Sequence, residues 1–277
     1  MKLKPNQTVL LTGASGGLGT YIARALAAYG LNQALVAFPG KDLPPLKEEL
    51  EKNGINAYYL VADLRIKEER QRVVDEVTKT FGKIDILINN AGVEFTAPYH
   101  ALGEDDITSV LEVNLGAPLR LTRLVIPFML ERGLGHIVNM SSLAGKAGPA
   151  YQEPYAATKS GLIAFTMALR ETYFRSGVSA SVICPGFIEA GIYARTKEES
   201  GCSAPALMGT SRPEKVGSAV IRAIQNDIPQ IIINPYPVRP ILALSEISPR
   251  LGAWVARAMG ASKFFRSVYM ARMERRD

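Results

Sequence analysis

The chain has 277 residues, 47% of them hydrophobic and 21% charged, and a formal net charge of +6. This length and apolar content suffice for one large folded domain and exclude a disordered chain. Two cysteines exclude a disulfide framework, and no residues have the spacing of metal ligands, so we expect a cytoplasmic protein without a metal site.

The first predicted elements are a strand, a glycine-rich turn and a helix. The apolar run 8–11 indicates a buried strand, Gly13 to Gly19 form the turn, and residues 21–29 have a helical pattern. The free N–H groups at the start of such a helix bind anions such as a pyrophosphate. We expect Gly13 to allow the tight turn, Gly17 to let the backbone approach the anion, and Gly19 to let the helix pack on the strand. An ordinary glycine-rich turn is the alternative for this motif alone.

Alternating strands and helices continue to residue 234. Further strands are expected at 33–38, 57–61, 84–89, 136–140, 179–184 and 230–233. Helices are expected at 67–81, 104–131, 155–174 and 213–225. The second of these breaks near Pro118 or Pro127, and the last begins with a capping box from Ser211 to Glu214. The alternation predicts an α/β fold with a doubly wound parallel sheet, the Rossmann fold, whose strand ends meet at one crevice.

A tyrosine and a lysine lie one turn apart in the predicted helix 155–174. Tyr155 and Lys159 therefore share a face, and an ammonium group beside a phenol lowers the phenol pKa from its usual value of about 10. Such a pair is suited to passing a proton to or from a carbinol oxygen that a serine hydroxyl holds in place. Ser142 lies thirteen residues before the tyrosine, although Ser141 is an equal candidate by position alone.

Together these motifs resemble the classical short-chain dehydrogenase/reductase family, over roughly residues 6–234. The matching segments are the glycine turn 12–19, Asp63-Leu64, Asn89-Asn90-Ala91-Gly92, Asn114, Ser142, Tyr155, Lys159 and Pro185-Gly186. Several independent motifs at the right separations make a chance match very improbable. The family's separation between its serine and tyrosine selects Ser142 over Ser141.

The resemblance implies hydride transfer between a nicotinamide cofactor and a carbonyl or secondary alcohol. Its implied catalytic residues are Tyr155 as general acid or base, Ser142 bonding the carbonyl oxygen, Lys159 bonding the nicotinamide ribose and lowering the tyrosine pKa, and Asn114 holding a relay water. The implied cofactor contacts are Gly13, Ser15, Gly17, Leu18, Gly19, Asp63, Leu64, Asn90, Ala91, Gly92, Tyr155, Lys159, Pro185, Gly186 and Ile188. In isolation, the sequence around Asn114 favours a solvent-facing helix residue, and Asp63 is equally well a turn or cap residue.

Two positions depart from the family pattern. Ala37 ends the second strand where an aspartate usually binds the ribose 2′-hydroxyl, and Phe38 follows where NADP users often have an arginine. Without a carboxylate to repel a 2′-phosphate, NADP is slightly preferred over NAD. Ala190 replaces a threonine that would bond the nicotinamide carboxamide, so the backbone of Ile188 or the hydroxyl of Tyr193 is expected to substitute.

The segments around the expected catalytic residues indicate the substrate class. Residues 191–209 are predicted to form a lid, because long loops of this kind often cover active sites. Segments 93–95 and 143–151 are mostly small or apolar, and no arginine cluster indicates a phosphorylated or carboxylated substrate. We therefore expect a lipophilic carbonyl or alcohol substrate, either 3-oxoacyl-like or steroid-like.

Residues 235–277 form a basic extension outside the family resemblance. Eight basic and three acidic residues give it a net charge of +5, nearly all of the chain's +6. Leu251, Trp254, Val255, Ala258 and Met259 recur at helical spacing. A basic amphipathic helix can lie on an anionic membrane, but packing over the substrate crevice or against another subunit is the commoner use of such a face. The charges are scattered and no recognition module is present, which argues against nucleic acid.

The leading prediction is an NAD(P)-dependent oxidoreductase. The family resemblance implies a homodimer or homotetramer, and peripheral membrane contact through 235–277 is left open. The alternatives are a non-catalytic dinucleotide-binding regulatory protein and a membrane-surface protein. The complete catalytic set argues against a non-catalytic role, because a scaffold does not require that geometry.

Overall fold

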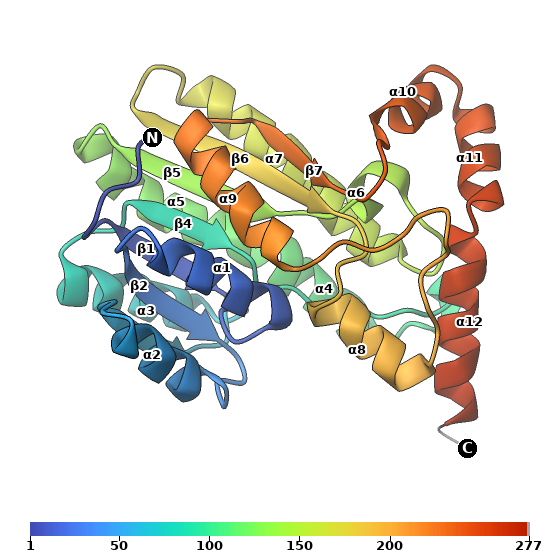
Figure 1. Cartoon of the computed structure of the whole chain (residues 1–277), viewed down its shortest axis with the longest axis horizontal. Coiled ribbons are helices and arrows are strands. Elements are labelled where there is room, and N and C mark those ends of the chain that lie inside the picture. The colour runs from blue at the N-terminus through green and yellow to red at the C-terminus, as the bar shows by residue number, and fades with distance from the viewer. Residues whose placement is uncertain (276–277) are drawn as a thin grey trace.

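A computed structural model of the protein describes residues 1–275 and contains a seven-stranded sheet with helices on both faces (Figure 1). All strands are parallel, in the order β3-β2-β1-β4-β5-β6-β7. The strands are β1 (Thr8–Thr12), β2 (Asn32–Ala37), β3 (Ala57–Val61), β4 (Ile86–Asn89), β5 (Gly135–Met140), β6 (Val178–Pro185) and β7 (Gln230–Ile233). The predicted doubly wound sheet is confirmed, and its topological switch point lies between β1 and β4.

Twelve α-helices and two short helical turns connect and extend these strands within residues 1–275. The helices are α1 (Gly17–Ala27), α2 (Leu43–Lys52), α3 (Lys67–Phe81), α4 (Glu104–Leu111), α5 (Ala117–Glu131), α6 (Ala144–Ala147), α7 (Glu153–Thr172), α8 (Gly191–Ser200), α9 (Glu214–Asn226), α10 (Arg239–Ile247), α11 (Pro249–Ala258) and α12 (Ala261–Glu274). The turns are η1 (Tyr99–Ala101) and the π-helical η2 (Glu112–Gly116).

Each face of the sheet has its own apolar core, because successive side chains of a strand point to opposite faces. Val9 and Leu11 of β1 belong to the core beneath α1, α2 and α9. Leu10, between them, belongs to the core beneath α3 and α5. Fully burying one such side chain stabilises the fold by about 1.5–3 kcal/mol. Burial on both faces therefore fixes the strands firmly, together with the strand ends that carry the expected site.

The long helical stretch 104–131 differs from its prediction in where it is interrupted. The interruption is the π-helical turn η2, whereas Pro118 lies in the first turn of α5 and Pro127 lies inside that helix. A proline in the first turn breaks no helical hydrogen bond. By length and composition this stretch is also the one candidate membrane span among the described residues. It packs against α3 and α7, as a core helix of the fold does.

One smaller prediction is wrong. The capping box before α9 does not form: Pro213 is the N-cap, and the Ser211 hydroxyl is buried without a partner. The backbone of Ser211 is instead held in a bridge to Ile188. His136 is buried in β5 against the Ser181 hydroxyl, at 2.9 Å. Burial lowers the pKa of His136 to about 3, so the imidazole is neutral.

The C-terminal extension follows β7 as α10, α11 and α12. Figure 1 shows α12 running beside α8, with α10 and α11 standing away from the sheet. Phe264 and Val268 of α12 are buried against Tyr193 of α8 and against Phe187. The sequence left open whether the extension packs on the protein or lies on a membrane, and α12 packs on the protein. The predicted lid 191–209 is not a loop throughout, because its first half is helix α8.

Candidate active site

One crevice runs along the carboxyl ends of the strands and has a volume of about 1120 Å³. At one end it is lined by the glycine turn and the end of β2, and at the other by α8 and the helices α10–α12. Every predicted site residue lines this cavity except Gly19 and Asn114. Residues far apart in the sequence are therefore brought to one crevice by the parallel sheet.

The glycine turn has the features of a dinucleotide site. Helix α1 begins at Gly17 with no side-chain cap and no acidic residue in its first turn, so no side chain of that turn competes with an anion for its free N–H groups. A Cβ atom at Gly19 would lie 2.1 Å from the carbonyl oxygen of Gly13, which explains the tight packing of helix on turn. A Cβ atom at Gly17 would lie 2.2 Å from the backbone nitrogen of Gly191, so this glycine also admits the start of the lid.

The ends of β1 and β4 are joined by hydrogen bonds at the switch point. The Thr12 hydroxyl accepts from the backbone N–H groups of Asn90 and Ala91, at 3.0 and 3.1 Å. The Asn90 amide donates to the carbonyl oxygens of Thr12 and Gly13, at 3.1 and 3.0 Å. Asn90 is thus placed at the predicted cofactor site, where its side chain fixes the glycine turn.

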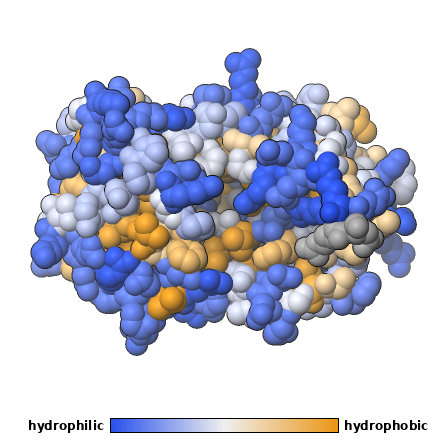
Figure 2. Space-filling model, turned by 90° about the horizontal axis from the view of Figure 1, so that it is seen from below, coloured by the Kyte–Doolittle hydropathy of each residue, from blue (hydrophilic) through white to orange (hydrophobic). Residues whose placement is uncertain are grey.

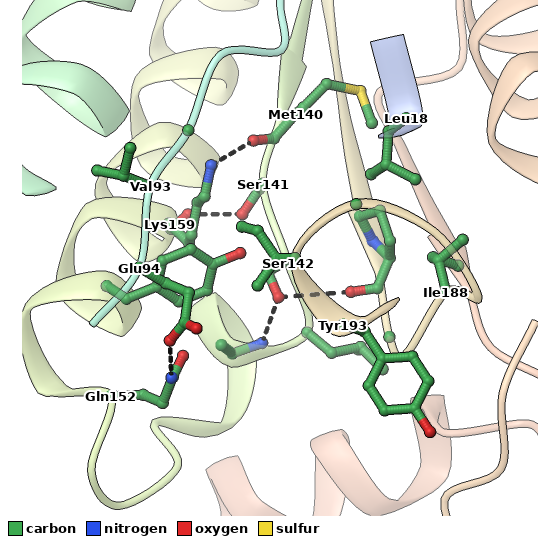
Figure 3. Close-up of a pocket in the computed structure, with 18 of the residues that line it drawn as sticks. Leu18, Val93, Glu94, Met140, Ser141, Ser142, Gln152, Lys159, Ile188 and Tyr193 are labelled. Carbon is green, nitrogen blue, oxygen red and sulfur yellow. Dashed lines mark hydrogen bonds between the residues drawn. The ribbon is translucent and has the colours of Figure 1, made fainter. Parts of the chain in front are cut away.

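The structure distinguishes the two candidate serines at the end of β5. The Ser141 hydroxyl is buried and donates to the backbone carbonyl of Lys159, at 2.7 Å, which ties β5 to α7. The Ser142 hydroxyl makes only a long bond of 3.4 Å to the carbonyl oxygen of Pro185 and accepts from the Ala144 N–H at 3.1 Å (Figure 3). Ser142 therefore keeps a hydroxyl that can bind a substrate oxygen, whereas Ser141 is a structural residue.

Tyr155 and Lys159 lie on α7, with Lys159 Nζ 5.5 Å from the centroid of the tyrosine ring. The buried ammonium group donates to the carbonyl oxygen of Met140 at 2.9 Å (Figure 3). Burial lowers the pKa of Lys159 to about 8 and raises the pKa of Tyr155 to about 12. The pKa of Tyr155 is therefore raised in this structure and not lowered as expected: Ser142 lowers it, but burial outweighs that effect. The phenol is protonated at neutral pH and can act as an acid.

Asn114 lies in the π-helical turn η2 and is fully buried, so it is not a solvent-facing residue. Its side chain makes two hydrogen bonds of 2.8 Å, donating to the carbonyl oxygen of Val93 and accepting from the Val93 N–H. Single π turns in helices often occur at functional sites. The side chain of Asn114 thus holds the segment after β4 in place, and its relay water stays a prediction.

The cofactor contacts expected elsewhere lie in two groups. Asp63 pairs with Arg65 at 2.6 Å and accepts from its backbone N–H at 3.0 Å, and Arg65 lowers the pKa of this carboxyl group. Ala37 and Lys41 line the same end of the cavity. Ala190 is the N-cap of α8, next to buried Ile188. The Tyr193 hydroxyl accepts from the Ala204 N–H at 3.0 Å, which ties it to the lid, and its substitution for the missing threonine stays a prediction.

Sequence reasoning missed one residue of the cavity wall. Glu94 follows the Asn-Asn-Ala-Gly motif, and its carboxylate is only 5% exposed (Figure 3). This charge raises the pKa of Tyr155 further. The available signal was the single acidic residue in a segment of otherwise small or apolar residues. A charge among such residues is costly to bury unless other groups hydrogen-bond to it or neutralise it.

Comparison with known proteins agrees with this geometry. The model of the short chain dehydrogenase family matches residues 7–201. The chain is 39% identical over 264 residues to the ketoacyl reductase HetN of Nostoc sp., covering 93% of this chain and 91% of that protein. It is 31% identical over 216 residues to the acetoacetyl-CoA reductase of Allochromatium vinosum, covering 76% and 88%. A solved variant of actinorhodin polyketide ketoreductase with NADPH has a TM-score of 0.77 and 30% identity, covering 82% of this chain and 95% of that one.

The match to the Nostoc protein covers so much of this chain that it includes part of the extension 235–277. These matches to reductases identify the protein as an enzyme and argue against the non-catalytic alternative. The chain belongs to the classical short-chain dehydrogenase/reductase family, and it is an oxidoreductase that acts on carbonyl or alcohol groups with NAD(P).

Proposed function

We propose that the protein reduces a lipophilic ketone of the 3-oxoacyl type, with NADPH as the preferred cofactor. The observation that carries this proposal is the convergence of Ser142, Tyr155 and Lys159 on one wall of the crevice. The relatives named as ketoacyl and acetoacetyl-CoA reductases support the acyl substrate over a steroid-like one.

In the proposed reaction the protein residues hold the ketone and supply the proton. Ser142 donates a hydrogen bond to the carbonyl oxygen, and Tyr155, protonated at neutral pH, gives its proton to that oxygen as it becomes an alkoxide. Lys159 stabilises the phenolate that remains, since its ammonium group lies beside the ring. The nicotinamide cofactor supplies the hydride when it is bound, held by the glycine turn and by residues 63–64, 90–92 and 185–188.

The substrate end of the cavity supports a lipophilic substrate. It is lined mainly by apolar side chains. These are Phe187 and Met208, together with residues of the C-terminal extension: Val238, Ile241, Leu242, Ala253, Ala256, Met259, Phe264 and Phe265. Figure 2 shows apolar side chains gathered in a band between two hydrophilic rims on the face seen from below. Apolar walls favour an alkyl chain by about 0.8 kcal/mol for each methylene group that they bury.

The cofactor end supports NADPH over NADH. Ala37 at the end of β2 presents no carboxylate to a 2′-phosphate, and the cations of Lys41 and Arg65 line the cavity nearby. Asp63 offsets part of the Arg65 charge through their ion pair. We therefore infer a modest preference rather than an exclusive one.

The surface of the extension supports peripheral membrane contact as an additional property. On α10 and α11, the side chains of Ile247, Leu251 and Trp254 are exposed, and Arg250 and Arg257 are exposed beside them. Apolar side chains flanked by cations suit an anionic bilayer surface. The proposal also includes a cytoplasmic location and a homodimer or homotetramer. The family resemblance implies the oligomer, and sedimentation equilibrium measures its size.

The proposed function is tested by depletion of NADPH or NADH at 340 nm with 3-oxoacyl thioesters and with ketosteroids. We expect turnover of the thioesters, and a loss of kcat of about 10²–10⁴-fold in Tyr155→Phe, because the proton donor is removed. Cofactor binding should persist in this variant. Undiminished turnover by Tyr155→Phe, or no binding of either dinucleotide by the wild type, would overturn the proposal.

A further inference from the structure

Glu94 is a buried carboxylate that the proposed reaction does not use. It belongs to the loop after β4, beside the residue that Asn114 holds, and its side chain is 5% exposed. An isolated charge in such a place is unfavourable unless hydrogen bonds and opposite charge compensate it.

The partners of Glu94 come from separate parts of the chain. One carboxylate oxygen accepts from Gln152 Nε2 at 2.6 Å (Figure 3). The same oxygen accepts from the Thr96 hydroxyl at 2.7 Å. The other oxygen accepts from the Thr196 hydroxyl on α8 and from Arg272 Nη2 on α12, both at 3.4 Å. The carboxylate therefore joins the catalytic wall, the lid and the C-terminal extension.

Arg272 is the cationic partner in this cluster. Its guanidinium also pairs with Glu199 of α8 at 3.0 Å and lies 3.4 Å from the Thr196 hydroxyl. The Arg272 side chain is only 25% exposed, so solvent screens its attraction to Glu94 less than it screens an ordinary surface pair. By contrast, Arg266, on the same helix, is exposed and does not line the cavity.

The apolar part of α12 places Arg272 where it can make these contacts. Phe264 and Val268 are buried against Tyr193 and Phe187, with the rings of Phe187 and Phe264 5.2 Å apart. Phe264 also lines the substrate end of the cavity. One helix thus forms part of the cavity wall through its first turns and contacts the lid and Glu94 through its last turn.

We propose that Arg272 is a positioning residue that clamps α12 and the lid helix α8 onto Glu94, and so makes the C-terminal extension a determinant of substrate binding. The identity of the substrate in this proposal rests on the proposed function. The attachment of α8 and α12 to Glu94 does not. A substrate with an apolar chain is held between the catalytic wall and α12, and the clamp keeps α12 in place against the cavity. Loss of the clamp weakens substrate binding while the Tyr155 chemistry persists.

The test compares Arg272→Gln with the matched control Arg266→Gln on the same helix. Hydrogen–deuterium exchange measures opening of α12 and α8 without any substrate. We expect exchange of α8 and α12 amides to rise roughly tenfold in Arg272→Gln and to stay at the wild-type rate in Arg266→Gln. Equal protection in the two variants overturns the clamp. If Arg272→Gln does not fold by circular dichroism, Arg272→Lys, which keeps the charge, should give an intermediate rise.

Kinetics supply the second measurement. For a 3-oxoacyl thioester we expect KM to rise roughly tenfold in Arg272→Gln, with kcat within about threefold of wild type. Adding Glu94→Gln to Arg272→Gln should raise KM less than the product of the single effects, because both changes break one interaction. A fall in kcat with unchanged KM contradicts the positioning role. If the wild type turns over no thioester, the proposed function fails, and the exchange experiment still decides the clamp.

Discussion

Tyr155 and Lys159, one helical turn apart, have pKa values displaced in opposite directions by the same burial. The phenol is harder to ionise, with a pKa of about 12, and the ammonium group is easier to deprotonate, with a pKa of about 8. Low polarity disfavours the charged form of each group, so burial favours the neutral phenol and the neutral amine alike. The residue pair is therefore suited to protonating a ketone at and below neutral pH.

This pair predicts the pH dependence of ketone reduction. Tyr155 stays protonated across the accessible range, whereas Lys159 loses its charge as the pH rises through about 8 rather than near its usual value. We expect kcat/KM for reduction to be level at lower pH and to fall above about pH 8, approaching tenfold for each pH unit. Circular dichroism measured over the same range serves as the control, because it reports any loss of folding. A profile that stays level to about pH 10 contradicts the assignment.

The residues of the candidate site that line the cavity could be picked out from the sequence, but their surroundings could not. The spacing of Ser142, Tyr155 and Lys159 indicated the wall that the structure contains. Glu94 was not predicted because its partners Thr196 and Arg272 lie 102 and 178 residues away. Only the folded chain brings these groups together, and local sequence contains no trace of the contact. The direction of the Tyr155 pKa shift was predicted wrongly for the same reason, because the burial of a side chain depends on the whole folded environment.

At the scale of elements, the apolar strands were predictable, and so was the polar helix α3, whereas α2 and α8 were not. All seven strands were expected, because buried parallel strands are short apolar runs. Helix α2 was not expected, since Pro44 and Pro45 resemble a turn but occupy the first helical turn, where proline is tolerated. Helix α8 was expected to be a loop because its polar second half includes Lys197 and Glu198, and packing against α12 supplies the stabilisation that its sequence does not indicate.

The end of β2 predicts cofactor preference. Ala37→Asp places a carboxylate beside the expected 2′-phosphate, so we expect KM for NADPH to rise roughly tenfold or more while KM for NADH changes little. Ala37 is 6% exposed, so Ala37→Asn is the control for the added volume. The measurement is steady-state kinetics with both dinucleotides. Equal effects of the two variants on NADPH would show that charge at this strand end does not decide the preference.

At the scale of the whole molecule, most of the excess positive charge lies on an extension that also forms part of the substrate cavity. Helix α12 is fixed to the body by Phe264 and Val268, whereas α10 has no buried residue and α11 has only Gly252. Residues of α10 and α11 line the cavity, whereas the exposed Ile247, Leu251 and Trp254 on the same helices do not. A membrane contact there would involve helices that also form part of the cavity wall.

Vesicle flotation tests this contact. We expect the protein to float with vesicles containing phosphatidylserine and not with phosphatidylcholine vesicles, and to lose roughly tenfold in binding when Ile247 and Trp254 are both changed to Ser. Phe174→Ser is the matched control, because Phe174 is 71% exposed after α7 and distant in sequence from the extension. Wild-type protein that stays at the bottom of the gradient, or equal loss in the control, removes the membrane proposal.

The single tryptophan of the chain, Trp254, lies on α11 with 62% of its surface exposed. Its emission therefore reports on the extension alone, without an engineered fluorophore or background from the sheet. Transfer of an indole from water to lipid, or its enclosure by an acyl chain, shifts that emission to shorter wavelength. The native chain thus carries its own optical sensor for events at the C-terminal extension.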